Sequence, residues 1–231
     1  ALSHSTGSNA TDAGILALCH SGRAKRDPEP RANGAPVALG SGFGLRPPRN
    51  DSRFYAVDLP MSIDFHKLRV AEVKRETPDA VSVRFELPEH LRETFAFRAG
   101  QHLTLRRDIE GEEVRRNYSV CVAPDDGVLK IGVKQIAGGV FSAWVNKELK
   151  AGDVLDVMAP HGRFCWSFEP DGRRDYVAFA GGSGITPVLS LMKTALAIEP
   201  NSRFTLFYGN RNSMGVMFLE EIAGLKDRIL D

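Results

Sequence analysis

Between residues 66 and 160 the chain alternates short apolar-rich segments with turn residues, and this spacing constrains the fold more than any other feature. Segments with strand character cover 66–85 (two strands around a Thr77-Pro78-Asp79 turn), 95–107, 115–122, 127–136 and 153–160. In this part of the chain, helical spacing is found over 141–150. Six short strands at close spacing with a single helix predict an antiparallel β-barrel.

The pattern changes at residue 174. A continuous apolar strand (174–180) is followed by a glycine-rich loop and a helix over 188–198, and a second buried strand (203–210) is followed by a second helix (217–227). Strand–helix–strand–helix at this spacing predicts a parallel α/β unit. A doubly wound sheet normally has about five or six strands. Two strands fit here, so we expect a truncated nucleotide-binding domain.

Residues 1–60 differ in composition from the rest of the chain. They hold 6 of the 13 prolines and 7 of the 22 glycines, with few periodic apolar residues. Such a segment cannot bury enough surface to offset its chain entropy. We therefore expect a non-native extension before Met61 or a disordered tail. The expected division is 1–60 as this extension, 61–168 as the barrel and 174–231 as the partial α/β domain.

The bulk composition is that of an ordinary soluble globular protein, with 42% hydrophobic residues and a net charge of +1. This charge creates no field that would attract nucleic acid or a membrane surface. No apolar run reaches the length of about 18 residues that a membrane span requires, and the stretch 14–19 is too short for a signal peptide. The three cysteines (Cys19, Cys121 and Cys165) lie far apart, which argues against a disulfide framework and a metal site. A reducing cytoplasm is expected.

The strand at 115–120, RRNYSV, combines residue types that suit a cofactor. Arg116 and Tyr118 lie two residues apart and so on one face of a strand. A guanidinium can bind a phosphate bidentately, and a phenol ring can lie on a planar heterocycle. Ser119 can offer its hydroxyl and backbone groups to the edge of that heterocycle. The alternative interpretation is a surface arginine beside a core tyrosine.

Two glycine-rich loops precede predicted helices. In the first, at 138–142, the free N–H groups of a helix start favour an anion, and Ser142 can act as a cap and a phosphate donor. Its alternative is an ordinary capped helix after a turn. The second, at 180–187, follows a buried strand, where pyrophosphates bind. It matches neither G-x-G-x-x-G nor G-x-S-x-G, but its glycine cluster favours a phosphate-binding role.

Four motifs then occur in a familiar order: R-x-Y-S (116–119), G-x-x-S (139–142), P-x-G-x-F (160–164) and G-x-G-I-T-P (182–187). The chain resembles the ferredoxin–NADP reductase superfamily over roughly 66–231. Within it, stretches such as AGQHLTLR and FYGNR are most similar to the reductase subunits of phenylacetyl-CoA epoxidases, which are reductases of the oxygenase type. The resemblance implies an antiparallel FAD-binding β-barrel followed by a parallel α/β nucleotide-binding domain, truncated in this chain.

The resemblance also implies roles for individual residues. Arg116 would meet the FAD pyrophosphate, Tyr118 would stack on the isoalloxazine and Ser119 would sit near its reactive edge. Further FAD contacts would come from Ile131, Val133 and Lys134 on the adenine–ribityl side and from Gly139, Val140 and Ser142 on the phosphates. Nicotinamide nucleotide contacts would come from Gly182, Gly184 and Thr186, with Arg211 and Ser213 on the 2′-phosphate, which favours NADPH over NADH. Tyr118, Ser119 and Thr186 are the residues expected nearest the chemistry.

The implied function is electron transfer from NADPH through FAD to a [2Fe–2S] centre and an oxygenase or ferredoxin-like acceptor. No C-x4-C-x2-C spacing for such a centre occurs here, so the cluster is expected only in a missing C-terminal part. Two alternatives stay open: a non-catalytic flavin-binding electron-relay subunit, and the reductase of another ring-hydroxylating oxygenase. His102 and His161 are expected to be structural, and no nucleic-acid or membrane partner is expected.

Overall fold

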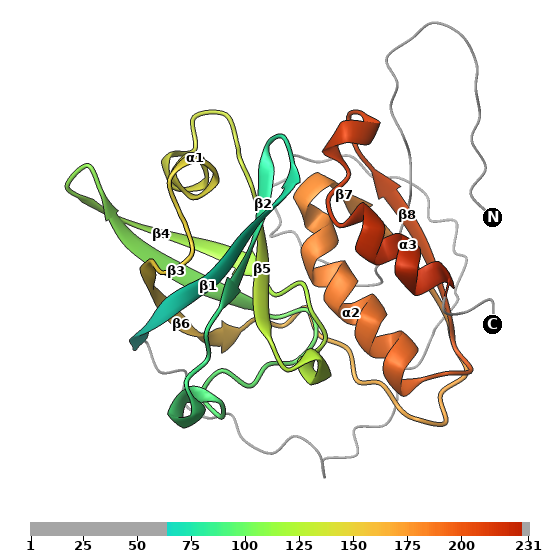
Figure 1. Ribbon diagram of the computed structural model, residues 1–231. Coiled ribbons are helices and arrows are strands. Elements are labelled where there is room, and N and C mark those ends of the chain that lie inside the picture. The colour runs from blue at the N-terminus through green and yellow to red at the C-terminus, as the bar shows by residue number, and fades with distance from the viewer. Residues whose placement is uncertain (1–63, 228–231) are drawn as a thin grey trace, which may run out of the picture. The chain divides into compact units, whose positions relative to one another are not determined.

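Six antiparallel strands make up the first half of the folded chain (Figure 1). The computed structural model describes residues 64–227, so the expectations about 1–60 lie outside the described residues. The strands are β1 (Phe65–Thr77), β2 (Ala80–Phe85), β3 (His102–Ile109), β4 (Glu112–Ser119), β5 (Leu129–Lys134) and β6 (Val154–His161). Their order in the sheet is β4-β3-β6-β1-β2-β5, and a single bridge between Val120 and Ile131 joins its two edges. The predicted antiparallel barrel is confirmed.

Alternate residues of these strands fill the barrel. The buried set comprises Leu68 and Val70 on β1, Val81, Val83 and Phe85 on β2, Leu103 and Leu105 on β3, Leu129, Ile131 and Val133 on β5, and Leu155 and Val157 on β6. This two-residue period is what a sheet with one buried face requires. Helix α1 (Val140–Lys147) adds Phe141, Trp144 and Val145 to the same core. The loop before α1 is thereby held against the barrel.

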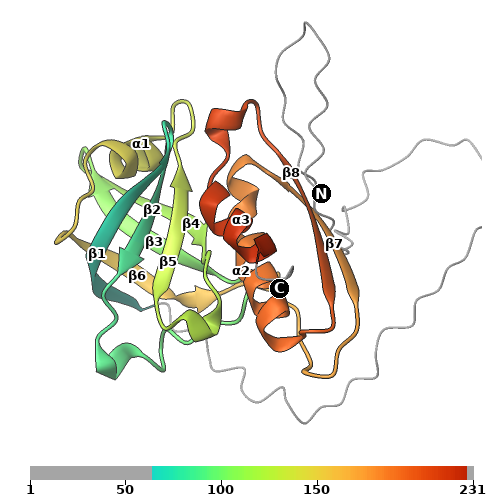
Figure 2. The ribbon, with the colours of Figure 1, turned by 45° about the vertical axis from the view of Figure 1, so that its right-hand side comes forward.

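A parallel α/β unit follows. Strands β7 (Asp175–Gly181) and β8 (Arg203–Gly209) pair in parallel and are joined by the short helix η3 (Gly182–Gly184) and α2 (Ile185–Ile198). After β8 come η4 (Ser213–Gly215) and α3 (Leu219–Asp227). Both long helices lie on one side of the strand pair (Figure 2). The predicted order of strands and helices is confirmed.

Some element boundaries differ from the expected ones. Residues 95–101 do not extend β3, because Gly100 adopts a φ of +93° that breaks the extended backbone. A side chain at Gly100 would also collide with the backbone, since a Cβ there would lie 1.8 Å from the carbonyl oxygen of Phe164. Helix α2 begins at Ile185 rather than at 188, with Pro187 in its first turn, where a missing N–H is tolerated.

The barrel and the α/β unit share contacts. Ala80 and Cys121 of the barrel part belong to one buried cluster with residues of β7, α2 and β8. Ser190 on α2 donates a hydrogen bond of 2.6 Å to the carbonyl oxygen of Val122. Residues 64–227 thus fall within one compact unit, and the division after residue 168 stays a prediction. No helix among the described residues is long and apolar enough to cross a membrane.

Candidate functional site

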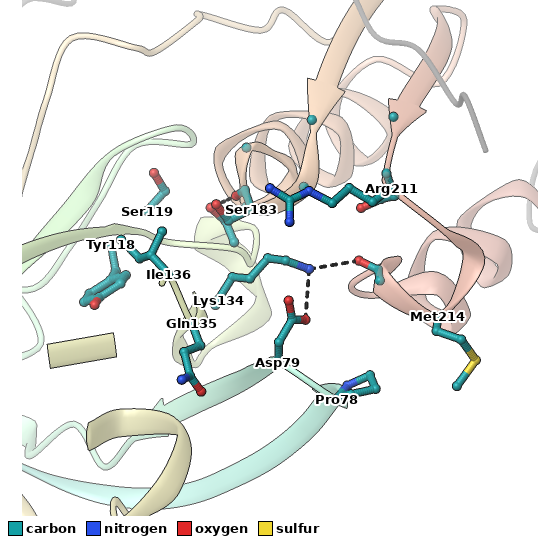
Figure 3. A pocket seen from close by; sticks show the side chains of 18 of the residues that line it. Pro78, Asp79, Tyr118, Ser119, Lys134, Gln135, Ile136, Ser183, Arg211 and Met214 are labelled. Carbon is teal, nitrogen blue, oxygen red and sulfur yellow. Dashed lines mark hydrogen bonds and ion pairs between the residues drawn. The ribbon is translucent and has the colours of Figure 1, made fainter. Parts of the chain in front are cut away.

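A pocket of about 1390 Å³ lies where the barrel and the α/β unit meet (Figure 3). Its walls come from the end of β4, the end of β5 and the loop after it, the loop between β7 and α2, and the segment after β8. Residues expected from the sequence that line it are Tyr118, Ser119, Lys134, Gly182, Gly184, Thr186 and Arg211. Two of the four motifs, R-x-Y-S and G-x-G-I-T-P, therefore meet around one space, together with Lys134 and Arg211.

Tyr118 presents a neutral aromatic ring at the end of β4. Its ring centroid lies 5.9 Å from that of Phe141 on α1. Burial raises the pKa of its phenol to about 12, despite the opposing effect of Arg116. The phenol therefore stays protonated at neutral pH, which suits stacking on a flat ring rather than proton transfer. Asn117 also lines the pocket, and its Oδ1 accepts a hydrogen bond of 2.8 Å from Thr104.

Arg116 is exposed and does not line the pocket itself. It pairs with Leu105 of β3, as Tyr118 pairs with Leu103, so the two side chains project from the same face of the sheet. Its Nη1 donates a hydrogen bond of 2.7 Å to the carbonyl oxygen of Arg115. The guanidinium has no carboxylate partner among the described residues, so it can receive a phosphate.

Lys134 places a cation inside the pocket at the end of β5. Its Nζ lies 3.0 Å from Asp79 Oδ1 and donates a 3.4 Å hydrogen bond to the carbonyl oxygen of Gly215 (Figure 3). Burial alone would raise the pKa of Asp79, but the hydrogen bonds from Thr77 and Lys134 outweigh it and hold that pKa below its usual value. Lys134 therefore connects β5 both to the turn between β1 and β2 and to the segment that follows β8.

Val133 and Ile131 are fully buried in the barrel core, so their side chains do not reach the pocket. Gly132 between them does line it. The loop residues Gln135, Ile136 and Ala137 also line the pocket, although they were not predicted as site residues. Their position in the sequence, directly between β5 and the Gly138-Gly139 pair, could have indicated that they line the site.

Ser142 is not the cap of α1, contrary to expectation. The N-cap is Gly139, and no side chain caps the helix. Ser142 is buried, donates a hydrogen bond of 3.2 Å to the Gly139 carbonyl and accepts one of 3.2 Å from the Ile136 N–H. Its hydroxyl is therefore used to shape the loop, and the G-x-x-S motif leaves backbone N–H groups as the donors for an anion. Gly139, Val140 and Ser142 lie outside the pocket lining.

The loop after β7 approaches β5 closely. Gly182 has a φ of +49°, a conformation that favours glycine. Thr186 is buried, and its Oγ1 donates a hydrogen bond of 3.0 Å to the Ser183 carbonyl. A Cβ placed on Gly132 would lie 2.7 Å from Thr186 Cγ2. The glycine on β5 therefore permits the contact between the predicted nicotinamide loop and the predicted flavin strand.

Arg211 follows β8 and lines the pocket, whereas Ser213 begins η4 outside the lining. Figure 3 shows the Arg211 side chain extended toward the loop that carries Ser183. Asn210 also lines the pocket, and its buried Nδ2 has no hydrogen-bond partner within the described part of the chain. Cations, a stacking ring, glycine-rich backbone and an unpaired donor fit a dinucleotide with phosphates.

Two sequence families match the chain in the same order as the two structural parts. Residues 67–166 match the family described as an oxidoreductase FAD-binding domain. Residues 179–229 match the family described as an oxidoreductase NAD-binding domain. FAD and a nicotinamide nucleotide are therefore the cofactors of this fold, and the residues around the pocket fit both.

Individual relatives agree with this assignment. The chain is 46% identical over 164 residues to one of the subunits of 1,2-phenylacetyl-CoA epoxidase of Escherichia coli, covering 71% of this chain and 46% of that protein. It is 38% identical over 165 residues to the ferredoxin reductase component of 3-ketosteroid-9-alpha-monooxygenase of Rhodococcus rhodochrous, covering 70% of this chain and 45% of that component. The chain thus spans about half the length of the curated relatives it matches.

A solved structure supports the fold. The FAD/NAD-binding domain of the nitric oxide dioxygenase from Vibrio cholerae superposes with a TM-score of 0.58 at 22% identity, covering 72% of this chain and 71% of that one. The two family matches and the two relatives, one of which is a ferredoxin reductase component, show that the chain belongs to the ferredoxin–NADP reductase superfamily, with an FAD-binding barrel and an NAD-binding α/β part.

Proposed function

We propose that this chain is the flavin- and nucleotide-binding part of an oxygenase reductase, which moves electrons from NADPH through FAD to a [2Fe–2S] centre and then to an oxygenase. The observation that carries the proposal is the shared pocket, which Tyr118 and Ser119 of β4 line together with Gly182, Ser183, Gly184 and Thr186. Hydride transfer needs the two reacting rings at a contact distance of about 3–3.5 Å. One pocket lined by both motifs gives the two rings a common space in which to meet.

Bound FAD would supply the chemistry that converts a two-electron hydride transfer into one-electron transfers. The chain's own residues bind and orient the two nucleotides. Tyr118 supplies a neutral ring for stacking, and Ser119 offers hydrogen bonds to the flavin edge. Arg116 and the backbone at Gly139 and Val140 hold the pyrophosphate. Thr186, packed on Gly132, limits how far the nicotinamide can lie from β5.

We assign the remaining positions as follows. Lys134 and the backbone of Val133 face the ribityl side, Gly182 and Gly184 receive the nicotinamide nucleotide, and Arg211 with Ser213 binds the 2′-phosphate of NADPH. Ser142 contributes through the loop that it shapes. The free thiols of Cys121 and Cys165 support a reducing compartment, and we place the protein in the cytoplasm.

The partner we favour is an oxygenase of the phenylacetyl-CoA epoxidase type, because a relative at 46% identity is a subunit of that enzyme. The second relative serves a ketosteroid monooxygenase, so the reductase of another oxygenase is the second candidate. Adding each oxygenase, with an iron–sulfur carrier, to the reduced protein distinguishes them. Substrate-dependent NADPH consumption is expected with the phenylacetyl-CoA epoxidase and not with the ketosteroid monooxygenase.

Anaerobic reduction of the bound flavin tests the core of the proposal. The chain is loaded with FAD, mixed with NADPH in a stopped-flow instrument and followed by flavin absorbance. Bleaching that saturates with NADPH is expected. A chain that binds FAD but is not reduced by NADPH or NADH would be a flavin-binding relay protein instead. A chain that takes up no FAD would contradict both interpretations.

A further inference from the structure

Tyr208, which the sequence analysis did not select, occupies a central place beside the pocket. It is the penultimate residue of β8 and only 1% exposed. Its hydroxyl donates a hydrogen bond of 2.8 Å to the carbonyl oxygen of Gly182 and accepts one of 3.2 Å from the N–H of Met217. One buried hydroxyl therefore holds two backbone groups that lie far apart in the sequence.

The two backbone groups belong to the two loops at the carboxyl end of the parallel strands. Gly182 follows β7, and Met217 lies between β8 and α3. In open α/β sheets this end of the strands is where nucleotides bind. Burial raises the pKa of the Tyr208 phenol to about 12, so the hydroxyl keeps its proton and can donate and accept at the same time.

Both loops have a positive φ near the groups that Tyr208 holds, but only one of these conformations is unfavourable. Gly182 has a φ of +49°, which glycine adopts readily, whereas Phe218, directly after Met217, has a φ of +58°. A bulky residue adopts a positive φ only where its surroundings enforce it. Phe218 is 2% exposed and Met217 is fully buried, so packing together with the Tyr208 hydrogen bond enforces this conformation.

The same loops meet the barrel at Gly132 of β5. A Cβ built on Gly132 would lie 2.7 Å from Thr186 Cγ2, 3.0 Å from Met217 Cε and 3.0 Å from Phe218 Cζ. All three side chains belong to the loops that Tyr208 joins or to the residues adjoining them. Two features thus set the position of both loops against β5. The Tyr208 hydroxyl joins the loops to each other, and the missing side chain at Gly132 lets them approach the strand closely.

We propose that Tyr208 is a positioning residue, whose hydroxyl joins the two nucleotide loops and sets how closely the Gly182–Thr186 loop approaches β5. This inference rests on the proposed function, because the approach matters for hydride transfer from NADPH to FAD. Tyr208 does not line the pocket itself. It acts through the carbonyl of Gly182 and the N–H of Met217.

The test replaces Tyr208 by Phe, which removes the hydroxyl and keeps the ring. Tyr176→Phe is the matched control, because Tyr176 also donates from its hydroxyl, 2.9 Å to Glu199 Oε2, but lies at the opposite end of the same strand pair and outside the pocket lining. Each variant loses one tyrosine hydroxyl and the two hydrogen bonds that this hydroxyl makes. Four quantities are measured on each: melting temperature, FAD dissociation constant, the NADPH concentration at half-saturation and the saturating rate of flavin reduction.

Tyr208→Phe is expected to reduce the saturating rate of flavin reduction by about tenfold, with FAD affinity unchanged. Tyr176→Phe is expected to lower the melting temperature and leave that rate unchanged. Gly132→Ala provides a second variant, which should also slow flavin reduction because its new methyl group displaces Thr186.

Equal rates in the wild type and Tyr208→Phe would overturn the inference while leaving the proposed function intact. So would equal losses of rate in Tyr208→Phe and Tyr176→Phe, which would show a general effect of stability. A wild-type chain whose flavin is never reduced would overturn the proposed function itself, and with it any positioning role for Tyr208.

Discussion

At the scale of single residues, the site depends on which way neighbouring side chains of one strand point. Tyr118 and Arg116 pair with Leu103 and Leu105 of β3, two residues that are buried in the barrel core. Arg115 lies on the opposite face, where its Nη2 is 2.7 Å from Glu113 Oε1. Two adjacent arginines therefore have different partners, and only Arg116 is placed beside the stacking ring.

Replacing Arg116 by Ala tests its assignment to the pyrophosphate. FAD affinity should fall by about tenfold or more, since a charge-assisted hydrogen bond to a phosphate contributes about 1.5–3 kcal/mol. FMN, which lacks the second phosphate, should lose less. Flavin fluorescence titrations with both cofactors measure this, with Arg115→Ala as the control. Equal losses for FAD and FMN would show that Arg116 does not bind the pyrophosphate.

A second substitution concerns nucleotide preference. Arg211→Ala should raise the KM for NADPH by about tenfold and leave that for NADH nearly unchanged, because the guanidinium would bind only the 2′-phosphate. Arg203→Ala is the control, since Arg203 lies at the other end of β8 with its Nε 3.9 Å from Asp175 Oδ1. Stopped-flow reduction with both nucleotides gives the two constants. Loss of NADH and NADPH rates alike would remove the basis for assigning NADPH.

At the scale of elements, a buried carboxylate ties the end of α2 to the start of β7. Glu199 is inaccessible to solvent. It accepts hydrogen bonds from Ser202, Tyr176 and the N–H of Glu169, and its Oε1 lies 2.5 Å from Arg174 Nη1. Burial alone would raise the pKa of Glu199. The hydrogen bonds to these groups, of which the one from Ser202 has the largest effect, outweigh burial and lower that pKa.

The lowered pKa of Glu199 predicts how the stability of the folded state changes with pH. A glutamate whose pKa is lower in the folded state stabilises that state above its unfolded value of about 4.3, and the contribution is lost as pH falls through the folded value. Glu199→Gln should therefore lower the melting temperature by about 4 °C or more at pH 7, with the same difference at pH 6. Below about pH 4 the difference should shrink. A difference that does not change down to pH 3 would contradict the assigned ionisation.

At the scale of the whole molecule, an ion network joins the barrel to the α/β helices. Lys193 on α2 lies 2.5 Å from Asp126 Oδ2 and 3.0 Å from Glu221 Oε1, and Lys130 on β5 lies 3.2 Å from Glu221 Oε2. Burial alone would lower the pKa of Lys193, but the hydrogen bonds to Asp126 and Glu221 outweigh it and raise that pKa. The network holds α2 and α3 against the strand that lines the pocket.

The role of residues 1–60 is tested by removing them. The composition of this segment lacks the apolar pattern of a core, so a chain that starts at Met61 should keep its FAD affinity and melting temperature. Thermal unfolding followed by circular dichroism, together with a flavin titration, makes the comparison. A fall of several degrees in melting temperature would show that the segment packs on the folded part.

The sequence by itself determined the elements and their order. The two-residue period of strands such as 127–136 and the glycines and prolines between them depend on neighbouring residues alone, so they are readable without the fold. Chain order then requires antiparallel pairing in the first part and parallel pairing where helices separate the strands. The motifs at 116–119 and 182–187 were recognisable for the same reason, because each lies within one strand end or one loop.

Only the tertiary structure decided what individual side chains do. Ser142 turns back to the Ile136 N–H and the Gly139 carbonyl, and Val133 packs into the barrel core. Tyr208 joins Gly182 to Met217 across two loops. These interactions depend on segments brought together by packing of the whole chain. The partner that a side chain meets across the fold, and how closely two segments approach, have no signature in local spacing.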